Sequence, residues 1–337
     1  MFSKLSAYSL HAQEPVTTRM NNEEKKTGWL ENFPVLLFTV IMGYSGLTLA
    51  LQIAGEVYLS KITLLITTCL FLLILLIYIM KIIVCRNSVI HEWQHPIKIS
   101  FFPAISISIL LLSMLFKTFS IEIATILWLV GIAAQTLLAL SVLANWIGNR
   151  PYETIHISPA WFIPTVGNII AAAGGVDLGF IQISWIFFSA GVIFWILLLT
   201  LVFNRLIFHD PLPERMVPTL AILVAPPAVT FLAWIKFNGG NVDSMAHAMY
   251  GASLAFLALT LTQARLLIQL AFSLSWWALS FPFAALVSAT MIYGTALNSQ
   301  LHLLLGRAGV FLLFLLIVGL SLRTVLAFFR KEICMPD

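Results

Sequence analysis

Ten long apolar runs, separated by short polar segments, occupy nearly the whole chain. Each run approaches or exceeds the roughly 20 residues that an α-helix needs to cross a bilayer. The pattern predicts an all-α integral membrane protein with ten transmembrane helices paired as five hairpins. The runs are residues 33–54, 62–84, 100–117, 121–146, 160–174, 180–203, 216–237, 244–264, 273–294 and 303–329.

Composition agrees with this pattern, since 60% of the 337 residues are hydrophobic and 9% are charged. Soluble domains average about 45–50% apolar and about 25% charged residues. We therefore expect a channel-like membrane domain over residues 33–329, a disordered cytoplasmic leader over residues 1–32 and a cytoplasmic tail over residues 330–337. The basic residues are not gathered into a patch interleaved with aromatics, so nucleic acid is not an expected partner.

The distribution of lysine and arginine predicts the orientation. With a cytoplasmic N-terminus, only four of the 18 basic residues fall on the far side of the membrane, namely Lys61, Lys117, Lys236 and Arg307. Positively charged loops stay in the cytoplasm, so both termini are expected there. For a bacterial protein this places the chain in the inner membrane.

Proline occurs in alternate runs. The first, third, fifth, seventh and ninth runs contain proline, at intervals of 56 to 69 residues, and the even runs contain none. A proline inside a helix removes one hydrogen bond and clashes with the preceding turn. Such a repeat predicts kinks in the five odd helices, at Pro34, Pro103, Pro164, Pro226 and Pro282.

Broken helices at membrane depth must be buried in protein or line a wet cavity. The even runs are rich in leucine and isoleucine, which suits lipid contact. We therefore expect a quasi-five-fold ring of odd helices around a central pore, with the even helices outside. Small, polar and aromatic residues of the odd runs are candidate pore-lining residues: Phe38, Gly43, Ser106, Asn168 and Phe283.

Acidic side chains fall at the edges of the runs or between them, so neither a proton relay nor an acidic cation filter is evident. Backbone N–H groups and hydroxyls at the breaks favour anions instead.

An H-E-x-x-H motif, His91 to His95, could hold zinc on a helix. Pro96 pushes His95 out of the helical region, which favours a solvated loop. No metal and no cofactor are expected.

Six segments, in order, carry a resemblance to a known family: FPVLLFTVIMGYSGLTLA (33–50), HPIKISFFPA (95–104), WFIPTVGNIIAA (161–172), LVAPPAV (223–229), NGGNVDS (238–244) and WWALSFPFA (276–284). The chain resembles the tellurite-resistance/dicarboxylate transporter family, which includes the bacterial protein TehA and the plant slow-type anion channels. The resemblance implies ten helices around a pore, often a homotrimer, and transport of chloride, nitrate, sulfite or C4-dicarboxylates. It also implies that Phe281, before Pro282, plugs the pore as a gate.

Two departures from bacterial relatives concern the pore. Leu36 and Thr39 stand where the first helix of those relatives has glycines, and the gate region reads SFPF rather than SFG.

The leading hypothesis is a gated, passive anion channel or uniporter in contact with membrane lipid. A proton-coupled exporter of dicarboxylate, sulfite or tellurite remains the alternative, and a membrane zinc protease is a distant one.

Overall fold

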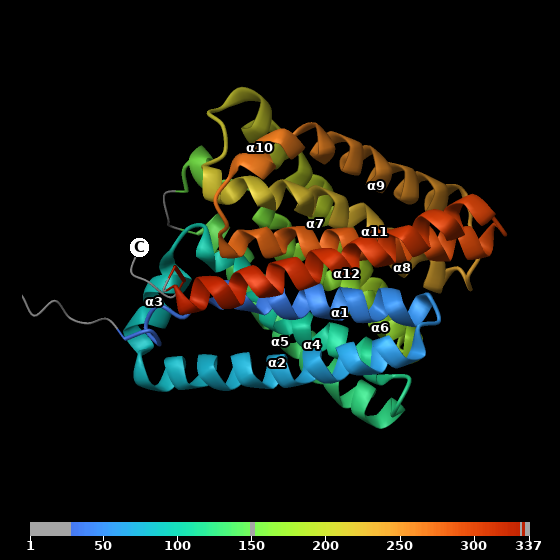
Figure 1. Ribbon diagram of the computed structural model, residues 1–337, viewed down its shortest axis with the longest axis horizontal. Coiled ribbons are helices and arrows are strands. Elements are labelled where there is room, and N and C mark those ends of the chain that lie inside the picture. Colours follow the sequence, from blue (N-terminus) through green and yellow to red (C-terminus); the bar gives the residue numbers. More distant parts are fainter. Residues whose placement is uncertain (1–27, 149–151, 331, 334–337) are drawn as a thin grey trace, which may run out of the picture.

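The computed structural model describes residues 28–148, 152–330 and 332–333. Ten helices in this part of the chain are long and apolar enough to span a membrane, as predicted. Their axes run in roughly the same direction (Figure 1). The predicted leader lies almost wholly outside the described residues, and so does most of the predicted tail.

Each odd span consists of a short 3₁₀ segment followed by an α-helix. These inner spans are η1 (Val35–Leu37) with α1 (Phe38–Ile53), η2 (Lys98–Phe101) with α4 (Pro103–Phe116), η4 (Pro159–Phe162) with α6 (Ile163–Asp177), η5 (Glu214–Val224) with α8 (Ala225–Phe237), and η6 (Leu274–Leu279) with α11 (Ser280–Ala296). The even spans are single helices: α2 (Val57–Val84), α5 (Ile121–Ile147), α7 (Ile181–Phe208), α9 (Ser244–Thr262) and α12 (Gln300–Phe329). Shorter elements are α3 (Arg86–Gln94), η3 (Thr154–His156) and α10 (Ala264–Gln269).

Four of the five prolines stand where a 3₁₀ segment gives way to α-helix. Pro103 is the first residue of α4, and Pro164 and Pro226 are the second residues of α6 and α8. Pro282 is the third residue of α11, while Pro34 precedes η1. The first N–H groups of an α-helix have no partner inside that helix, so a proline there forfeits no α-helical hydrogen bond. The predicted kinks are therefore changes of helix type at the start of each inner α-helix.

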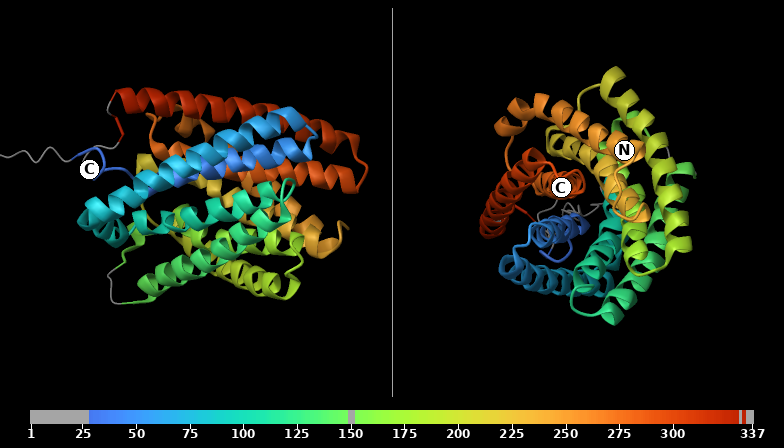
Figure 2. Two further views of the ribbon diagram at one scale, coloured as in Figure 1. Left: turned by 90° about the horizontal axis from the view of Figure 1, so that it is seen from below. Right: turned by 90° about the vertical axis from the view of Figure 1, so that its right-hand side faces the viewer.

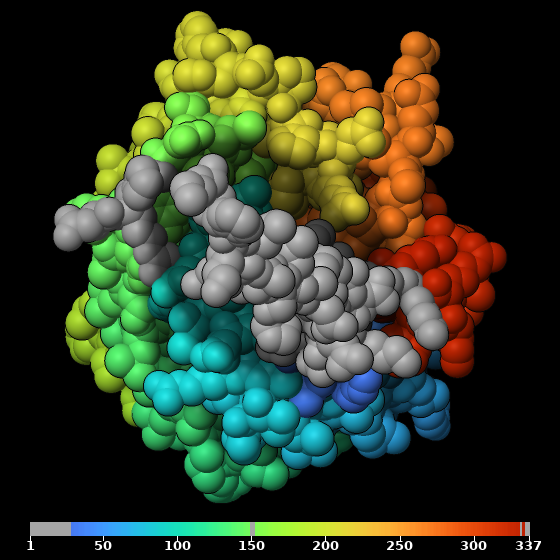
Figure 3. All heavy atoms as spheres, turned by 90° about the vertical axis from the view of Figure 1, so that its left-hand side faces the viewer, coloured from blue at the N-terminus to red at the C-terminus, as the bar shows by residue number. Residues whose placement is uncertain are grey.

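The five inner helices form a closed ring. Each of α1, α4, α6 and α8 packs on the next inner helix in the chain, and α11 returns to α1. The outer helices α2, α5, α7, α9 and α12 pack on the inner helix that precedes them. Seen from either end, the hairpins follow one another around the axis in chain order (Figures 2 and 3).

Burial separates the two sets of helices. Within an 18-residue apolar window of each span, 72 to 94% of the residues are buried in the inner spans, against 22 to 33% in the outer spans. Because apolar side chains lose nothing in contact with lipid, the exposed leucines and isoleucines of the outer helices suit a membrane environment. The predicted arrangement, with proline-bearing spans inside and leucine-rich spans outside, is confirmed.

Small residues allow α1 to approach α11. A Cβ atom added at Gly43 would lie 2.4 Å from Ser280 Oγ, and one added at Gly46 would lie 2.6 Å from Ala284 Cβ. Both distances are shorter than van der Waals contact, so these positions require glycine. The contact brings the helix that carries Phe281 against α1.

Gln135 of α5 joins two inner helices from outside. Its Nε2 donates to Pro164 O (2.8 Å) and to Asn168 Oδ1 (3.1 Å) in the α6 span, while its Oε1 accepts from Ser106 Oγ (2.7 Å) of α4. The side chain is fully buried. Gln135 thus satisfies polar groups close to two of the proline breaks.

Replacing Gln135 with leucine is expected to destabilise the protein by about 1–3 kcal/mol, because Pro164 O and Asn168 Oδ1 lose their donor in a buried site. Denaturant unfolding of the purified protein in detergent measures the change. Thr136→Val is the matched control, since Thr136 is exposed and its hydroxyl bonds only within its own helix. Equal midpoints for Gln135→Leu and Thr136→Val would contradict the role given to Gln135.

Candidate functional site

Two cavities lie inside the ring, and each is lined by residues from all five inner spans. The break-side cavity is lined from the 3₁₀ segments and the starts of the α-helices. The far-side cavity is lined from further along the same helices. Stacked in this order, the cavities follow the axis of the ring.

Phe281 separates the two cavities. It is the one residue among the described lining residues that lines both. The side chain is 7% exposed, and its ring lies beside Gly46 of α1. The ring of Phe281 therefore lies between the two cavities and contributes apolar surface to both.

The cavity walls are almost entirely apolar. Hydroxyl groups are contributed by Thr39 on the break side and by Ser288 on the far side. Thr39 Oγ1 donates to Leu36 O at 2.7 Å, so its hydrogen is already used. Ser288 makes no hydrogen bond within the described part of the chain, and its hydroxyl is available to a solute.

The five candidate pore-lining residues lie elsewhere. Phe38 packs on α2, with its ring 6.4 Å from that of Phe71 and 5.8 Å from that of Tyr78. Gly43 faces α11, and Ser106 and Asn168 face Gln135. Phe283 is partly buried against the hydrophobic core. None of the five is among the lining residues of either cavity.

Of the two positions where family glycines are replaced, Thr39 lines the break-side cavity and Leu36 does not. Leu36 is partly buried against the core. The additional bulk relative to glycine therefore narrows the cavity at Thr39.

The H-E-x-x-H segment does not lie in a solvated loop as expected. Residues 86–94 form α3, and His95 ends it with extended backbone torsions (φ −74°, ψ 126°). His95 Nδ1 accepts hydrogen bonds from Ile97 N and Lys98 N. The two histidines therefore do not share a helical face, which a zinc site of this type requires.

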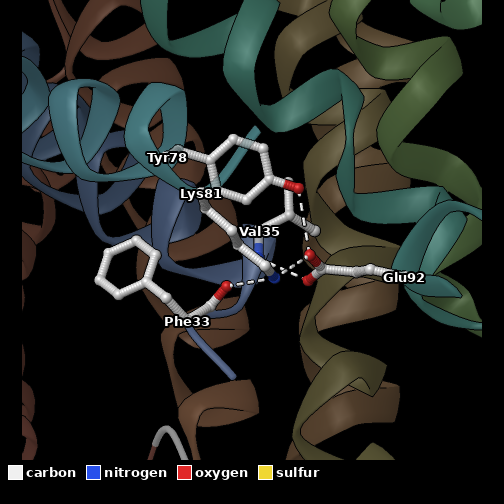
Figure 4. A network of polar contacts seen from close by, with 5 residues as sticks. All are labelled: Phe33, Val35, Tyr78, Lys81 and Glu92. Carbon is white, nitrogen blue, oxygen red and sulfur yellow. Dashed lines mark hydrogen bonds and ion pairs between the residues drawn. The ribbon is translucent and has the colours of Figure 1, made fainter. Parts of the chain in front are cut away.

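Glu92 of this segment instead belongs to a buried polar network (Figure 4). Its Oε2 accepts from Lys81 Nζ (2.8 Å) and Tyr78 Oη (3.1 Å) of α2, and its Oε1 accepts from Val35 N (2.7 Å). Lys81 Nζ also donates to Phe33 O at 2.8 Å. The network holds the first residues of the first inner span against α2 and α3.

Sequence reasoning missed this network, although a signal was present. Inward-facing residues of α2 recur every three or four positions, and Tyr78 and Lys81 continue this stripe after Phe71 and Ile74. That spacing defines one face of an α-helix. A lysine on the buried face needs a partner, and Glu92 is the acidic residue that α3 folds back towards it.

Comparison with known proteins yields one family. A profile of the SLAC1 family, described as voltage-dependent anion channel, matches residues 32–325. Similar curated proteins include the S-type anion channels SLAH3 and SLAH2 of Arabidopsis thaliana, which are 24% and 28% identical over 89% and 80% of this chain. A tellurite resistance protein TehA homolog of Haemophilus influenzae is 26% identical over 77% of this chain and 81% of its own length. The chain spans about half the length of the two plant relatives, 49% and 54%.

Lys81→Met and Glu92→Gln are each expected to destabilise the protein by about 3–5 kcal/mol, because each leaves a buried partner without its counter-charge. Unfolding in detergent measures both, and the double variant should lose less than the sum of the two. Arg330→Gln is the control, since the Arg330–Glu332 pair is exposed and contributes little. Strict additivity of the two buried substitutions would refute a coupled pair.

Proposed function

Because the chain belongs to the SLAC1 family of voltage-dependent anion channels, we propose that it is a gated, passive channel or uniporter for small anions. Chloride, nitrate, sulfite and C4-dicarboxylates are the candidate substrates. The observation that carries the proposal is the position of Phe281 between two axial cavities. The resemblance to the family implies that the same residue is the pore gate.

The gate works by displacement of one aromatic ring. Moving a buried phenylalanine side chain into water costs roughly 1.5–3 kcal/mol. Such a cost keeps most channels closed, yet a ligand or a partner can overcome it. Rotation of the Phe281 side chain changes only its χ angles and leaves the backbone hydrogen bonds of α11 in place.

Neutral walls favour passive transport. The lining residues of both cavities carry no acidic, basic or histidine side chain. Coupling to protons requires a group in the path that gains and loses a proton, and neither cavity wall supplies one. The cavity walls also lack the acidic side chains with which a cation filter attracts its ions. The free hydroxyl of Ser288 is a donor that an anion can accept from.

The zinc protease alternative is not retained, because Glu92 is held by Lys81 and His95 lies beyond the helix.

We further propose a homotrimer in the bacterial inner membrane with both termini in the cytoplasm. The resemblance supports the trimer, and the distribution of basic residues supports the orientation. Chemical cross-linking in membranes and protease accessibility of tagged termini test these two points.

Phe281→Ala is expected to raise anion current by about tenfold or more, since the lost ring contacts of roughly 1.5–3 kcal/mol held the closed state. Voltage clamp of oocytes or planar bilayers measures the current. Phe283→Ala is the matched control, because Phe283 lies on the same helix and lines neither cavity. With the protein verified at the surface, equal currents in the two variants would sink the gate assignment.

Anion flux through the Phe281→Ala form is expected to follow the anion gradient and membrane potential, with no change when a pH gradient is imposed. The reason is that no titratable side chain lines the two cavities. Proteoliposomes loaded with chloride, nitrate or malate measure the flux with and without the pH gradient. Accumulation of the anion against its electrochemical gradient, driven by protons, would instead favour the exporter.

A further inference from the structure

Three inner helices end in charged side chains at the end of the ring opposite the proline breaks. Lys117 follows the last residue of α4, Asp177 is the last residue of α6, and Lys236 is the penultimate residue of α8. Asp177 Oδ2 lies 2.5 Å from Lys236 Nζ, and Asp177 Oδ1 lies 3.4 Å from Lys117 Nζ. We call these three residues the mouth cluster.

The mouth cluster continues the lining of the far-side cavity by one helical turn. Met114, Ala173 and Leu232 line that cavity, and the cluster residues follow them by three or four positions. Residues with this spacing lie on the same face of an α-helix. Lys236 Nζ also donates to Ala173 O at 3.3 Å, so the ammonium group lies directly beside a cavity-lining residue.

The charges of the mouth cluster do not cancel. Two ammonium groups share one carboxylate, which leaves a net charge of about +1. The side chains are 22 to 39% exposed, so water and ions reach them. A lysine ammonium has three donors, and Lys236 uses one on Asp177 and one on Ala173 O. One N–H therefore remains for an anion.

The position of this charge matters because helix ends carry charge of their own. The C-terminal end of an α-helix behaves as roughly half a negative charge, and three such ends carry the mouth cluster. Without the lysines, this end of the ring would repel anions. The other two inner helices contribute only Ile53 and Ile292 at the equivalent positions, four residues beyond Leu49 and Ser288.

We propose that Lys236 and Lys117, oriented by Asp177, form an anion-binding site that concentrates small anions at the mouth of the far-side cavity. This proposal rests on the proposed channel function. It adds that anions are selected over cations at the mouth cluster. Anions enter from the mouth cluster, pass the hydroxyl of Ser288 and reach Phe281. Both lysines fall on the side of the membrane to which the topology assigns only four basic residues.

The test uses single-channel conductance in the Phe281→Ala background. Lys236→Gln is expected to lower conductance roughly two- to fivefold at about 20 mM salt, for anions that enter from the mouth cluster. In 1 M salt, where charges are screened within about 3 Å, the difference should vanish. Asp177→Asn should raise conductance at low salt, because it removes the negative charge between the lysines.

Lys61→Gln is the matched control, since Lys61 lies near the same end but on an outer helix, α2. Lys236→Arg, which keeps the charge, should retain conductance, and Lys117→Gln should act like Lys236→Gln if the latter folds poorly. Equal conductance of Lys236→Gln and Lys61→Gln at low salt overturns the mouth site while leaving the channel proposal standing. Absence of anion current in Phe281→Ala itself overturns the channel proposal and the mouth site together.

Discussion

The whole architecture depends on where a proline can stand in a membrane protein. Proline has no N–H group to donate, and the bilayer core offers no water to replace a lost hydrogen bond. In this chain each inner α-helix has proline in its first turn or just before the preceding 3₁₀ segment, where unpaired donors are ordinary. Such helix starts at membrane depth are tolerated because outer helices shield them from lipid. In the ring of five hairpins, every one of these helix starts is covered by outer helices and so kept from lipid.

Many polar side chains near the proline breaks form hydrogen bonds with backbone carbonyl groups. Near the breaks, hydroxyls donate back to carbonyl groups of the preceding turn, as Thr165 does to Phe162 O and Ser280 to Trp277 O. Gln135 serves two more acceptors from outside the ring. These hydroxyls therefore bind the backbone and do not face a solute. What remains for the axis is a mostly apolar wall, and the apolar ring of Phe281, the proposed gate, matches it.

The spans, their inner or outer place and the importance of the prolines could be predicted from the sequence, because hydropathy and proline periodicity act over whole segments. The direction of single side chains could not be predicted as well. Asn168 and Ser106 were expected in the pore, yet Gln135 draws them to the outer side of the ring. The outer helices appeared lipid-like all round, although each has one buried stripe that can include a polar residue, such as Lys81 in α2 or Gln135 in α5. A single polar residue hardly changes the mean hydropathy of a span, although it determines how that span packs. The mean hydropathy therefore does not reveal it.

Charged side chains are arranged differently at the two ends of the ring. One end has a buried ion pair, and the other has a partly exposed cluster with a net positive charge. At the proline end, Lys81 and Glu92 are buried and neutralise each other, so they stabilise the fold without projecting a field. At the other end, Lys117, Asp177 and Lys236 are partly exposed and retain a positive charge beside the far-side cavity. In the proposed channel, rapid conduction requires that an anion bind weakly enough to leave again. A partly exposed, screened ammonium group followed by a neutral wall meets this requirement, whereas a buried charge along the axis would hold the anion in place.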